Sequence, residues 1–239
     1  MFRVGLCVGV LLAALSGCGH GAPAQPGGAT PTAASTAPTR AASTVSFSDD
    51  FEHGLRRWQL ADAEAWRLAS GREGHGSALS LVRQSDFQPP HRSPFNIALV
   101  KGVDVAGFTF DGDVRSTVKD YPHRDMAMIF GYEDPAHLYY VHFGKTTDQY
   151  SNGIFIVDGA DRVKLTAATT PTNWDDGWHH VRVVRSAATG NIKVYFDDMT
   201  EPVMTTTDKT LAWGRVGVGS FDDLGDWDDV RLEGKAHTR

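Results

Sequence analysis

The sequence contains almost no cysteine, and the part of it that can fold contains none. Its two cysteines, Cys7 and Cys18, both lie near the N-terminus of the 239-residue chain. A disulfide in the rest of the chain is therefore excluded, and a domain there has to be stable through its hydrophobic core. The roughly 190 residues that follow the polar N-terminal region are enough to bury such a core in one domain.

Clusters of basic residues are absent as well. Arg3 and Arg40 are the only charged residues before Val45, so the rest of the chain carries 21 of the 23 basic residues against all 29 acidic ones, a formal charge of −8. An acidic domain without a basic run disfavours nucleic acid and anionic lipid surfaces as partners. We therefore expect no nucleic acid partner.

The apolar stretch at the N-terminus, from Val4 to Leu15, is too short for a transmembrane helix and is typical of the core of a signal peptide. It ends in "LSGC", which resembles the bacterial lipobox. The resemblance implies that residues 1–17 are a signal peptide and that Cys18 carries a lipid. The exported protein would then be anchored in the cell envelope, at the outer membrane or cell surface, and would contact the membrane only through this lipid. An ordinary secretory signal followed by a chance cysteine is the alternative.

Residues 18–45 have the composition of a flexible tether. From Gly19 to about Thr44 the chain consists mainly of Ala, Pro, Gly, Ser and Thr, with no large apolar residue. Such a segment cannot bury enough surface to offset its ordering entropy, and it would span a few tens of ångströms. We predict a folded domain over residues 46–235 and a short C-terminal tail over 236–239.

The domain consists of short alternating runs such as "SALSLV", "LYYVHFG", "NIKVYFDD" and "GRVGVGSF". Turn sequences such as "EDPAH" and "DDLGD" separate them, and no segment of helical length shows a 3.6-residue period. Strands at this spacing predict an all-β sandwich, with at most a helical turn in "DFEHGLRRW".

Three stretches resemble the concanavalin A-like jelly roll: "FSDDFEHGLRRW", "GWHHVRVVRSAATGNIKVYFDD" and "GRVGVGSFDDLGDWDDVRLEG". The laminin-G-like and the 3-keto-disaccharide hydrolase-like branches are the most similar. The resemblance implies two curved antiparallel sheets with a glycan groove on the concave face. It is specific for the fold and not for an activity, because the superfamily includes lectins, glycosidases, polysaccharide lyases and adhesion modules.

Alternation in "LYYVHFG" places Tyr140 and His142 on the face opposite Val141 and Phe143. A tyrosine offers a ring and a hydroxyl, and a histidine offers a donor and an acceptor. We predict that Tyr140 and His142 face a sugar and act as the catalytic pair if the protein is an enzyme. A buried tyrosine and histidine that bond to the backbone are the alternative.

Four further residues are predicted to bind substrate beside this pair. The link "EDPAH" predicts a hairpin, which brings His123 and Arg124 toward His142, while Arg115 and Asn152 lie on adjoining runs. Jelly-roll polysaccharide lyases resemble this set in kind, because Arg, Asn or His neutralises a uronate there and a Tyr or His moves the proton. A polar glycan-binding face without catalysis explains the same residues.

Two other groups of residues are predicted to be structural. The retaining glycosidases of this fold share a Glu-x-Asp-x-(x)-Glu strand, which is missing here, and Asp111 and Asp113 on one strand favour a solvated strand face. His179 and His180 are adjacent on a strand, so they face opposite ways and cannot easily bind one metal ion. Three tryptophans are expected in the core: Trp58, Trp66 and Trp213.

An acidic cluster at the two ends of the domain predicts a structural calcium. "SDDFE" opens the domain and "GDWDDV" lies near its end. The terminal strands of concanavalin A-like domains often lie together, and many relatives hold calcium there, so the resemblance implies Asp50 and Asp228 as ligands. A carbonyl near Gly74 or Gly76 would complete the oxygen ligands that calcium prefers.

Three functions are consistent with these observations. The first is the binding of a polysaccharide or oligosaccharide by a surface lipoprotein. We favour it because the sequence carries a clear signature of the fold but no complete catalytic motif. The second is degradation of a carbohydrate, by a lyase or by a glycoside hydrolase of the 3-keto-disaccharide type. The third is a scaffold or adhesion domain that binds protein, which a flat apolar patch would favour.

Overall fold

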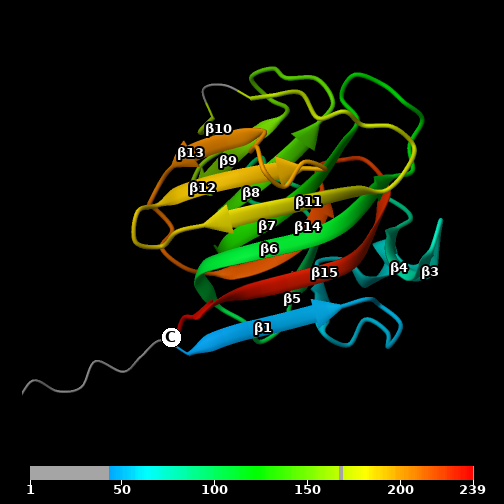
Figure 1. The fold of residues 1–239 in the computed structure, drawn as a ribbon, viewed down its shortest axis with the longest axis horizontal. Coiled ribbons are helices and arrows are strands. Elements are labelled where there is room, and N and C mark those ends of the chain that lie inside the picture. The colour runs from blue at the N-terminus through cyan, green and yellow to red at the C-terminus, as the bar shows by residue number, and fades with distance from the viewer. Residues whose placement is uncertain (1–42, 167–168, 239) are drawn as a thin grey trace, which may run out of the picture. The chain divides into compact units, whose positions relative to one another are not determined.

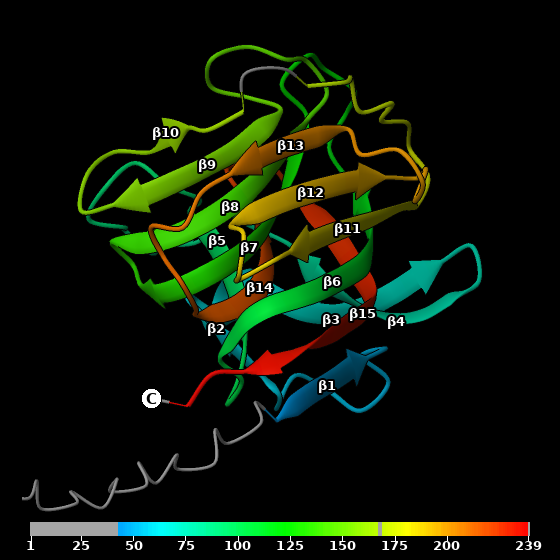
Figure 2. The same cartoon turned by 60° about the vertical axis from the view of Figure 1, so that its left-hand side comes forward.

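A computed structural model describes residues 43–166 and 169–238 of the chain. The predicted signal peptide, Cys18 and nearly all of the predicted tether lie outside the described residues. The described part is an all-β sandwich whose two antiparallel sheets lie face to face, as predicted (Figures 1 and 2). Its one helical element is a short 3₁₀ turn, η1 (Ala63–Ala65). No helix among the described residues has the length and apolarity needed to cross a membrane.

Sheet A has eight strands. Seven of them follow one another in a single row, and the eighth, β1, pairs with β15 outside this row. In spatial order it consists of β13 (Met204–Thr207), β12 (Asn191–Phe196), β11 (His179–Arg185), β6 (Val105–Ser116), β15 (Gly225–Ala236), β4 (His75–Leu81) and β3 (Trp66–Arg72), with β1 (Thr44–Asp49) against β15.

Sheet B has seven strands and forms the other layer. In spatial order it consists of β10 (Val163–Lys164), β9 (Gly153–Asp158), β8 (His137–Gly144), β7 (Asp125–Asp134), β14 (Arg215–Ser220), β5 (Asn96–Val100) and β2 (Trp58–Leu60).

The core lies between the sheets and follows the alternation of the strands. On β8 the side chains of Tyr139, Val141 and Phe143 point into it, and on β6 those of Phe110 and Val114 do the same. All five are fully buried. This alternation is what the period-2 pattern of the sequence predicted.

The outer face of sheet B carries a second apolar cluster that is also covered. Phe87 and Phe95, from the segment between β4 and β5, pack against it. The Phe95 ring meets that of Phe221 edge-on at 5.1 Å. The cluster consists of Ile97, Leu99, Ala127, Ile129, Tyr132, Leu138, Tyr140, Phe155, Val157 and Phe221. The outer face of sheet B is therefore mostly closed to solvent.

Two predicted pairings are confirmed. The link "EDPAH" joins β7 and β8 in an antiparallel hairpin, in which Asp125 lies opposite Gly144. The first and last strands, β1 and β15, lie side by side along their length (Figure 1). Strand β1 begins at Thr44, which lies within the predicted tether, and its pairing with β15 explains why Thr44 and Val45 belong to the sheet.

Candidate functional site

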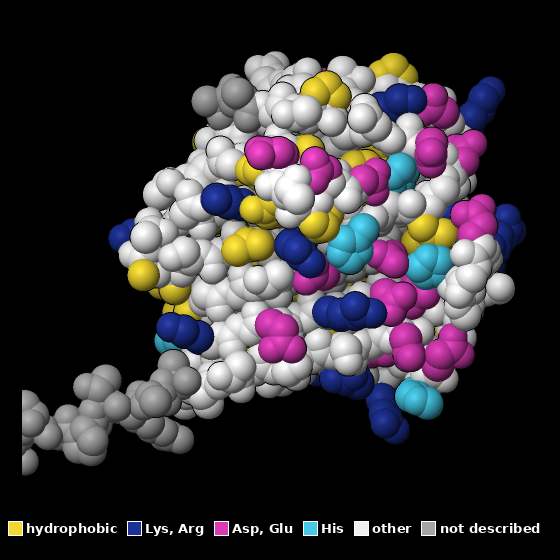
Figure 3. Space-filling view, in the orientation of Figure 1, with side chains coloured by type: hydrophobic (Ala, Val, Ile, Leu, Met, Phe, Trp, Pro, Cys, Tyr) yellow, Lys and Arg dark blue, Asp and Glu magenta, His cyan; other side chains and the backbone are white. Residues whose placement is uncertain are grey.

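The outer face of sheet A is polar, and unlike that of sheet B it is partly open to solvent, at His180, Asp113 and Tyr195. Side chains of β11, β6 and β15 that point away from the core meet there in cross-strand pairs, such as Arg182 opposite Asp111 and His180 opposite Asp113. Figure 3 views the molecule from this side and shows acidic, basic and histidine side chains next to one another. We call this surface the polar face; it consists of Tyr195, Arg182, His180, Asp111, Asp113, Arg115, Asp226, Asp228 and His75, with Trp178 at its border.

A chain of charged hydrogen bonds runs across the polar face. Arg182 donates through Nε to Asp111, and the two nitrogens of the His180 ring face Asp113 and, at 3.4 Å, Asp111. On its other side, Asp113 lies 3.9 Å from Nε2 of His75. The side chains of His180 and Asp113 are 37% and 22% exposed, so a ligand in solution can reach them.

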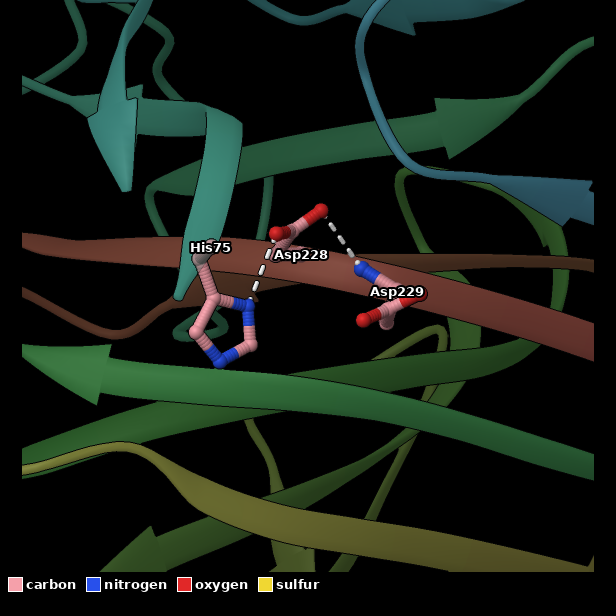
Figure 4. A group of neighbouring side chains, drawn as sticks. All are labelled: His75, Asp228 and Asp229. Carbon is pink, nitrogen blue, oxygen red and sulfur yellow. Dashed lines mark hydrogen bonds and ion pairs between the residues drawn. The ribbon is translucent and has the colours of Figure 1, made fainter. Parts of the chain in front are cut away.

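His75 is held in one orientation at the end of this chain (Figure 4). Its Nδ1 lies 2.8 Å from Oδ2 of Asp228, and Oδ1 of that carboxylate accepts a hydrogen bond of 2.7 Å from the Asp229 N–H. The His75 ring stacks on Trp178 with 4.1 Å between centroids. Trp178 in turn donates through Nε1 to the carbonyl of Gly71. The imidazole is therefore fixed by both a carboxylate and an aromatic ring.

The network shifts the pKa values of its members. Hydrogen bonds to Asp111 and then to Asp113 raise the pKa of His180 to about 9, despite partial burial. Burial acts to raise the pKa of Asp111, but hydrogen bonds from His180 and Arg182 outweigh it and the pKa lies below its usual range. Burial raises the pKa of Asp228, although the Asp229 N–H and His75 oppose the shift. At neutral pH, His180 is thus a cation between two carboxylates.

The stability of the protein is expected to depend on the charge of His180. Folding raises the pKa of His180 to about 9. The contribution of its charge to stability is therefore fully present below the unfolded pKa of about 6.5, and it is lost as the pH rises through the folded pKa. Because the side chain is 37% exposed, solvent screening reduces the effect to about 1 kcal/mol. Urea unfolding from about pH 6 to pH 9.5 should show this loss in the native chain and not in His180→Asn. Equal slopes in both proteins would contradict the assignment.

A cavity of about 550 Å³ adjoins the polar face. It brings together two residues that were predicted to bind substrate, Arg115 and Arg124. Arg115 pairs with Asp226 at 2.6 Å, and its guanidinium lies 5.4 Å from the centre of the Trp178 ring. The volume suits a small ligand such as part of a sugar chain.

Several solved structures share this architecture. The carbohydrate-binding module CBM66 from Bacillus subtilis superposes with a TM-score of 0.54 at 16% identity, over 75% of this chain and 97% of the module. The jelly-roll sandwich fold predicted from the sequence is confirmed. The acidic lectin of winged bean, solved with methyl-α-D-galactose, matches this fold with a TM-score of 0.52 at 12% identity, over 82% of this chain and 100% of the lectin.

Lectin I of Ulex europaeus, solved with the methyl glycoside of α-L-fucose, gives a TM-score of 0.51 at 11% identity, over 80% of this chain and 97% of the lectin. No family model and no curated protein matches the chain. At these identities, the likeness establishes the jelly-roll fold alone, and the ligand of this chain has to be argued from its own residues.

The predicted catalytic pair lies on the predicted face of its strand, but that face is covered. Tyr140 is fully buried and His142 is 6% exposed. The Tyr140 hydroxyl accepts a 2.6 Å hydrogen bond from Arg162, and burial raises its pKa, so the phenol is a poor base. His142 lies 2.9 Å from Oδ2 of Asp125 and 3.1 Å from the carbonyl of Tyr150. Their catalytic role stays a prediction, and their burial gives a polysaccharide no direct access.

The predicted substrate-binding residues do not converge with this pair. Arg115 lies on sheet A, whereas Tyr140 and His142 lie on sheet B, so the six residues cannot share one face. Asn152 is fully buried with a positive φ of 46° and donates to Thr147 and to the backbone of a neighbouring loop. His123 is exposed, 3.8 Å from Asp148. The local alternation and the pairing of β8 with β7 and β9 were predicted correctly, but the run that carries Arg115 lies in the other sheet.

The two residues predicted to bind calcium do not belong to one group of metal-ligating side chains. Asp228 uses both carboxylate oxygens within the polar face, and its neighbours in a candidate metal group are Asp229 and a nitrogen donor, His75. Asp50 belongs to neither group of three metal-ligating side chains found among the described residues. It lines a cavity of about 360 Å³, which Asp229 also lines. A calcium ion held by Asp50 and Asp228 together stays a prediction.

The residues interpreted as structural are partly confirmed. His179 is buried and bonds to Asp197, and Trp58 and Trp66 are in the core. Trp213 is only partly buried and stacks on His237. Asp111 and Asp113 do not form a freely solvated strand face, because His180 and Arg182 bridge them into the polar face.

The sequence analysis did not single out Tyr195, Arg182 or His75. Tyr195 is a partly exposed aromatic residue opposite Arg182, and within the described chain its hydroxyl has no hydrogen-bond partner. The alternation in "NIKVYFDD" and "HHVRVVR" already separates Tyr195 and Arg182 from the core valines. The order of the strands in sheet A, which brings them together, is not contained in either run.

Proposed function

We propose that the protein binds a polysaccharide or oligosaccharide on the polar face of sheet A. The observation that carries the proposal is the contrast between the two outer faces. Sheet B is covered by an apolar cluster, while sheet A presents charged donors and acceptors beside Tyr195 and Trp178. Protein sites for sugars combine such polar groups with aromatic rings. The carbohydrate-binding module and the lectins of the same fold support this class of ligand.

A binding screen tests the proposal. The purified protein should be retained by at least one polysaccharide in a panel of neutral, uronate-containing and fructose-based polymers, and a soluble oligosaccharide of the same type should release it. Protonated His180 donates hydrogen bonds to Asp111 and Asp113 and so holds the polar face in its arrangement. Glycan binding should therefore weaken when the pH is raised above the His180 pKa of about 9. Failure to bind any member of a broad panel would contradict the proposal.

Degradation of the glycan is a second candidate, favoured by His75. Asp228 fixes its Nδ1, so that Nε2 points toward Asp113 at 3.9 Å, and a carboxylate-oriented imidazole can act as a general base. The same screen distinguishes the two candidates, since a lyase produces absorbance at about 235 nm and a hydrolase produces new reducing ends. Binding without either product would leave the protein as a lectin-like module.

We propose further that Cys18 anchors the chain in the cell envelope. The support is the apolar stretch that ends in "LSGC" and the tether composition that follows it. Incorporation of a labelled fatty acid into the native chain and its loss in Cys18→Ser would support the anchor. Equal labelling of the two proteins would refute it.

A further inference from the structure

A second cluster of carboxylates lies away from the polar face, where the chain passes from β14 in sheet B to β15 in sheet A. It consists of Asp125, the first residue of β7, together with Asp222 and Asp223 in the connection. Each offers a carboxylate oxygen, and the three oxygens lie within 4.8 Å of one another. Asp125 is fully buried and Asp223 is 7% exposed, while Asp222 is exposed and opens the cluster to solvent.

The buried carboxylate of Asp125 has one oxygen without a partner. Its Oδ2 accepts a 3.0 Å hydrogen bond from the Phe221 N–H and lies 2.9 Å from His142 Nε2. Its Oδ1 is buried and has no hydrogen-bond partner among the described residues. A buried carboxylate oxygen without a partner is costly, so this atom calls for a bound cation or a hydrogen-bond donor.

The surrounding bonds position the carboxylate of Asp223, and none of them neutralises the charge of Asp223 or Asp222. Asp223 accepts a hydrogen bond of 2.8 Å from the Asp125 N–H and one of 2.7 Å from the Tyr121 hydroxyl. The Asp222 carboxylate makes no hydrogen bond or ion pair with the described residues. Nearby guanidinium groups lie over the Phe221 ring and form no ion pair with the three carboxylates.

The charge of the cluster is therefore compensated only in part. His142 is the single basic side chain within ion-pair distance of the three carboxylates among the described residues. Carboxylates this close to one another repel when they are ionised. A bound divalent cation would remove this repulsion.

We propose that Asp125, Asp222 and Asp223 form a calcium-binding site at this end of the sandwich. The donor set consists only of carboxylate oxygens, which calcium prefers, and the exposed side leaves room for the waters that complete its shell. Calcium tolerates irregular geometry, whereas magnesium requires a near-octahedral shell. The site is separate from the polar face and does not depend on the glycan-binding proposal.

Calorimetric titration of the full-length chain with calcium chloride, together with thermal unfolding after treatment with EDTA, tests this site. We expect binding heat, and a rise in Tm of roughly several degrees at about 10 mM calcium, a concentration above the Kd of about 10⁻⁴–10⁻³ M of extracellular calcium modules. Magnesium should bind more weakly. The absence of both heat and a Tm shift with calcium would overturn the site, and tighter binding of magnesium would overturn the choice of ion.

Two variants locate the ion. Asp222→Asn removes an exposed ligand that makes no internal bond, so the protein should fold normally and bind calcium about tenfold more weakly or worse, because affinity follows the charge of the ligands. Asp50→Asn is the matched control, since Asp50 is also exposed and lies outside the cluster. The calcium affinity of this variant should equal that of the native chain. Calcium binding that survives Asp222→Asn unchanged would overturn the proposal, even if Asp50→Asn lost it.

Discussion

Tyr195→Ala is expected to weaken binding of the retained polysaccharide by about thirtyfold or more. The ring is partly exposed on the polar face, opposite Arg182 on β11, which in turn lies opposite Asp111 on β6. A central aromatic anchor typically contributes at least about 2 kcal/mol to an interface, and each 1.4 kcal/mol changes the affinity about tenfold. Since the hydroxyl makes no hydrogen bond within the described chain, the stability of the protein should change little. Affinity measured by calorimetry, with urea unfolding alongside it, checks both parts.

Tyr150→Ala is the matched control for this prediction. Tyr150 is 56% exposed but lies in the loop between β8 and β9, away from the polar face. Its backbone carbonyl, which faces His142, is kept in the variant. Glycan affinity should therefore equal that of the native chain. A loss with Tyr150→Ala and none with Tyr195→Ala would place the glycan on the other side of the molecule.

Arg124→Ala is expected to lower the free energy of unfolding by about 3 kcal/mol or more. The side chain is 1% exposed and donates to the carbonyls of Asp175 and Val118, at 2.7 and 2.9 Å, and to the carboxylate of Asp176. Its removal leaves these carbonyls without their donor, and hydrogen bonds from a charged donor contribute about 1.5–3 kcal/mol each. Urea unfolding of the variant measures the loss.

Arg67→Ala serves as the control for Arg124→Ala. Arg67 is exposed on β3 and makes no ion pair or hydrogen bond with side chains of the described residues. A surface change of this kind should stay within about 0.5 kcal/mol. If Arg124→Ala unfolds like the native chain and loses only glycan affinity, then Arg124 binds substrate, as the sequence analysis predicted, and does not hold the loops together.

The fold was predictable because its signal is local. In "LYYVHFG" the apolar residues alternate, and the structure places Val141 and Phe143 in the core and His142 on the opposite face. Such a pattern fixes the face of each side chain with no knowledge of the neighbouring strands. The hairpin through "EDPAH" has the same local character, because its short turn forces the two runs to pair.

The site was not predictable in the same way, because alternation does not reveal what covers a face. Tyr140 and His142 point outward from sheet B, as expected, but Phe87 and Phe95 from a distant segment close that face. The polar face depends instead on strand order. Asp113 of β6 meets His180 of β11 and lies near His75 of β4 only because the sheet brings these strands together.

The calcium prediction shows how a correct strand pairing can still leave the two predicted ligands in different surroundings. The terminal strands do lie together, with Asp49 opposite Val230. An irregularity of β15 between Asp228 and Arg231 then turns Asp228 toward β6 and His75, while Asp50 follows the end of β1. A single irregular position is enough to separate two aspartates that the sequence places at matching ends.

The place of β15 has a consequence for how the chain reaches its native state. This last strand lies inside sheet A, where it pairs with β6 on one side and with β4 and β1 on the other. These three strands are synthesised before β15 and cannot complete their pairing in sheet A until β15 has been made. Pairing between such distant segments has a high contact order and is slow. The completion of sheet A is therefore a late step in folding, since its central strand follows all the strands that pair with it.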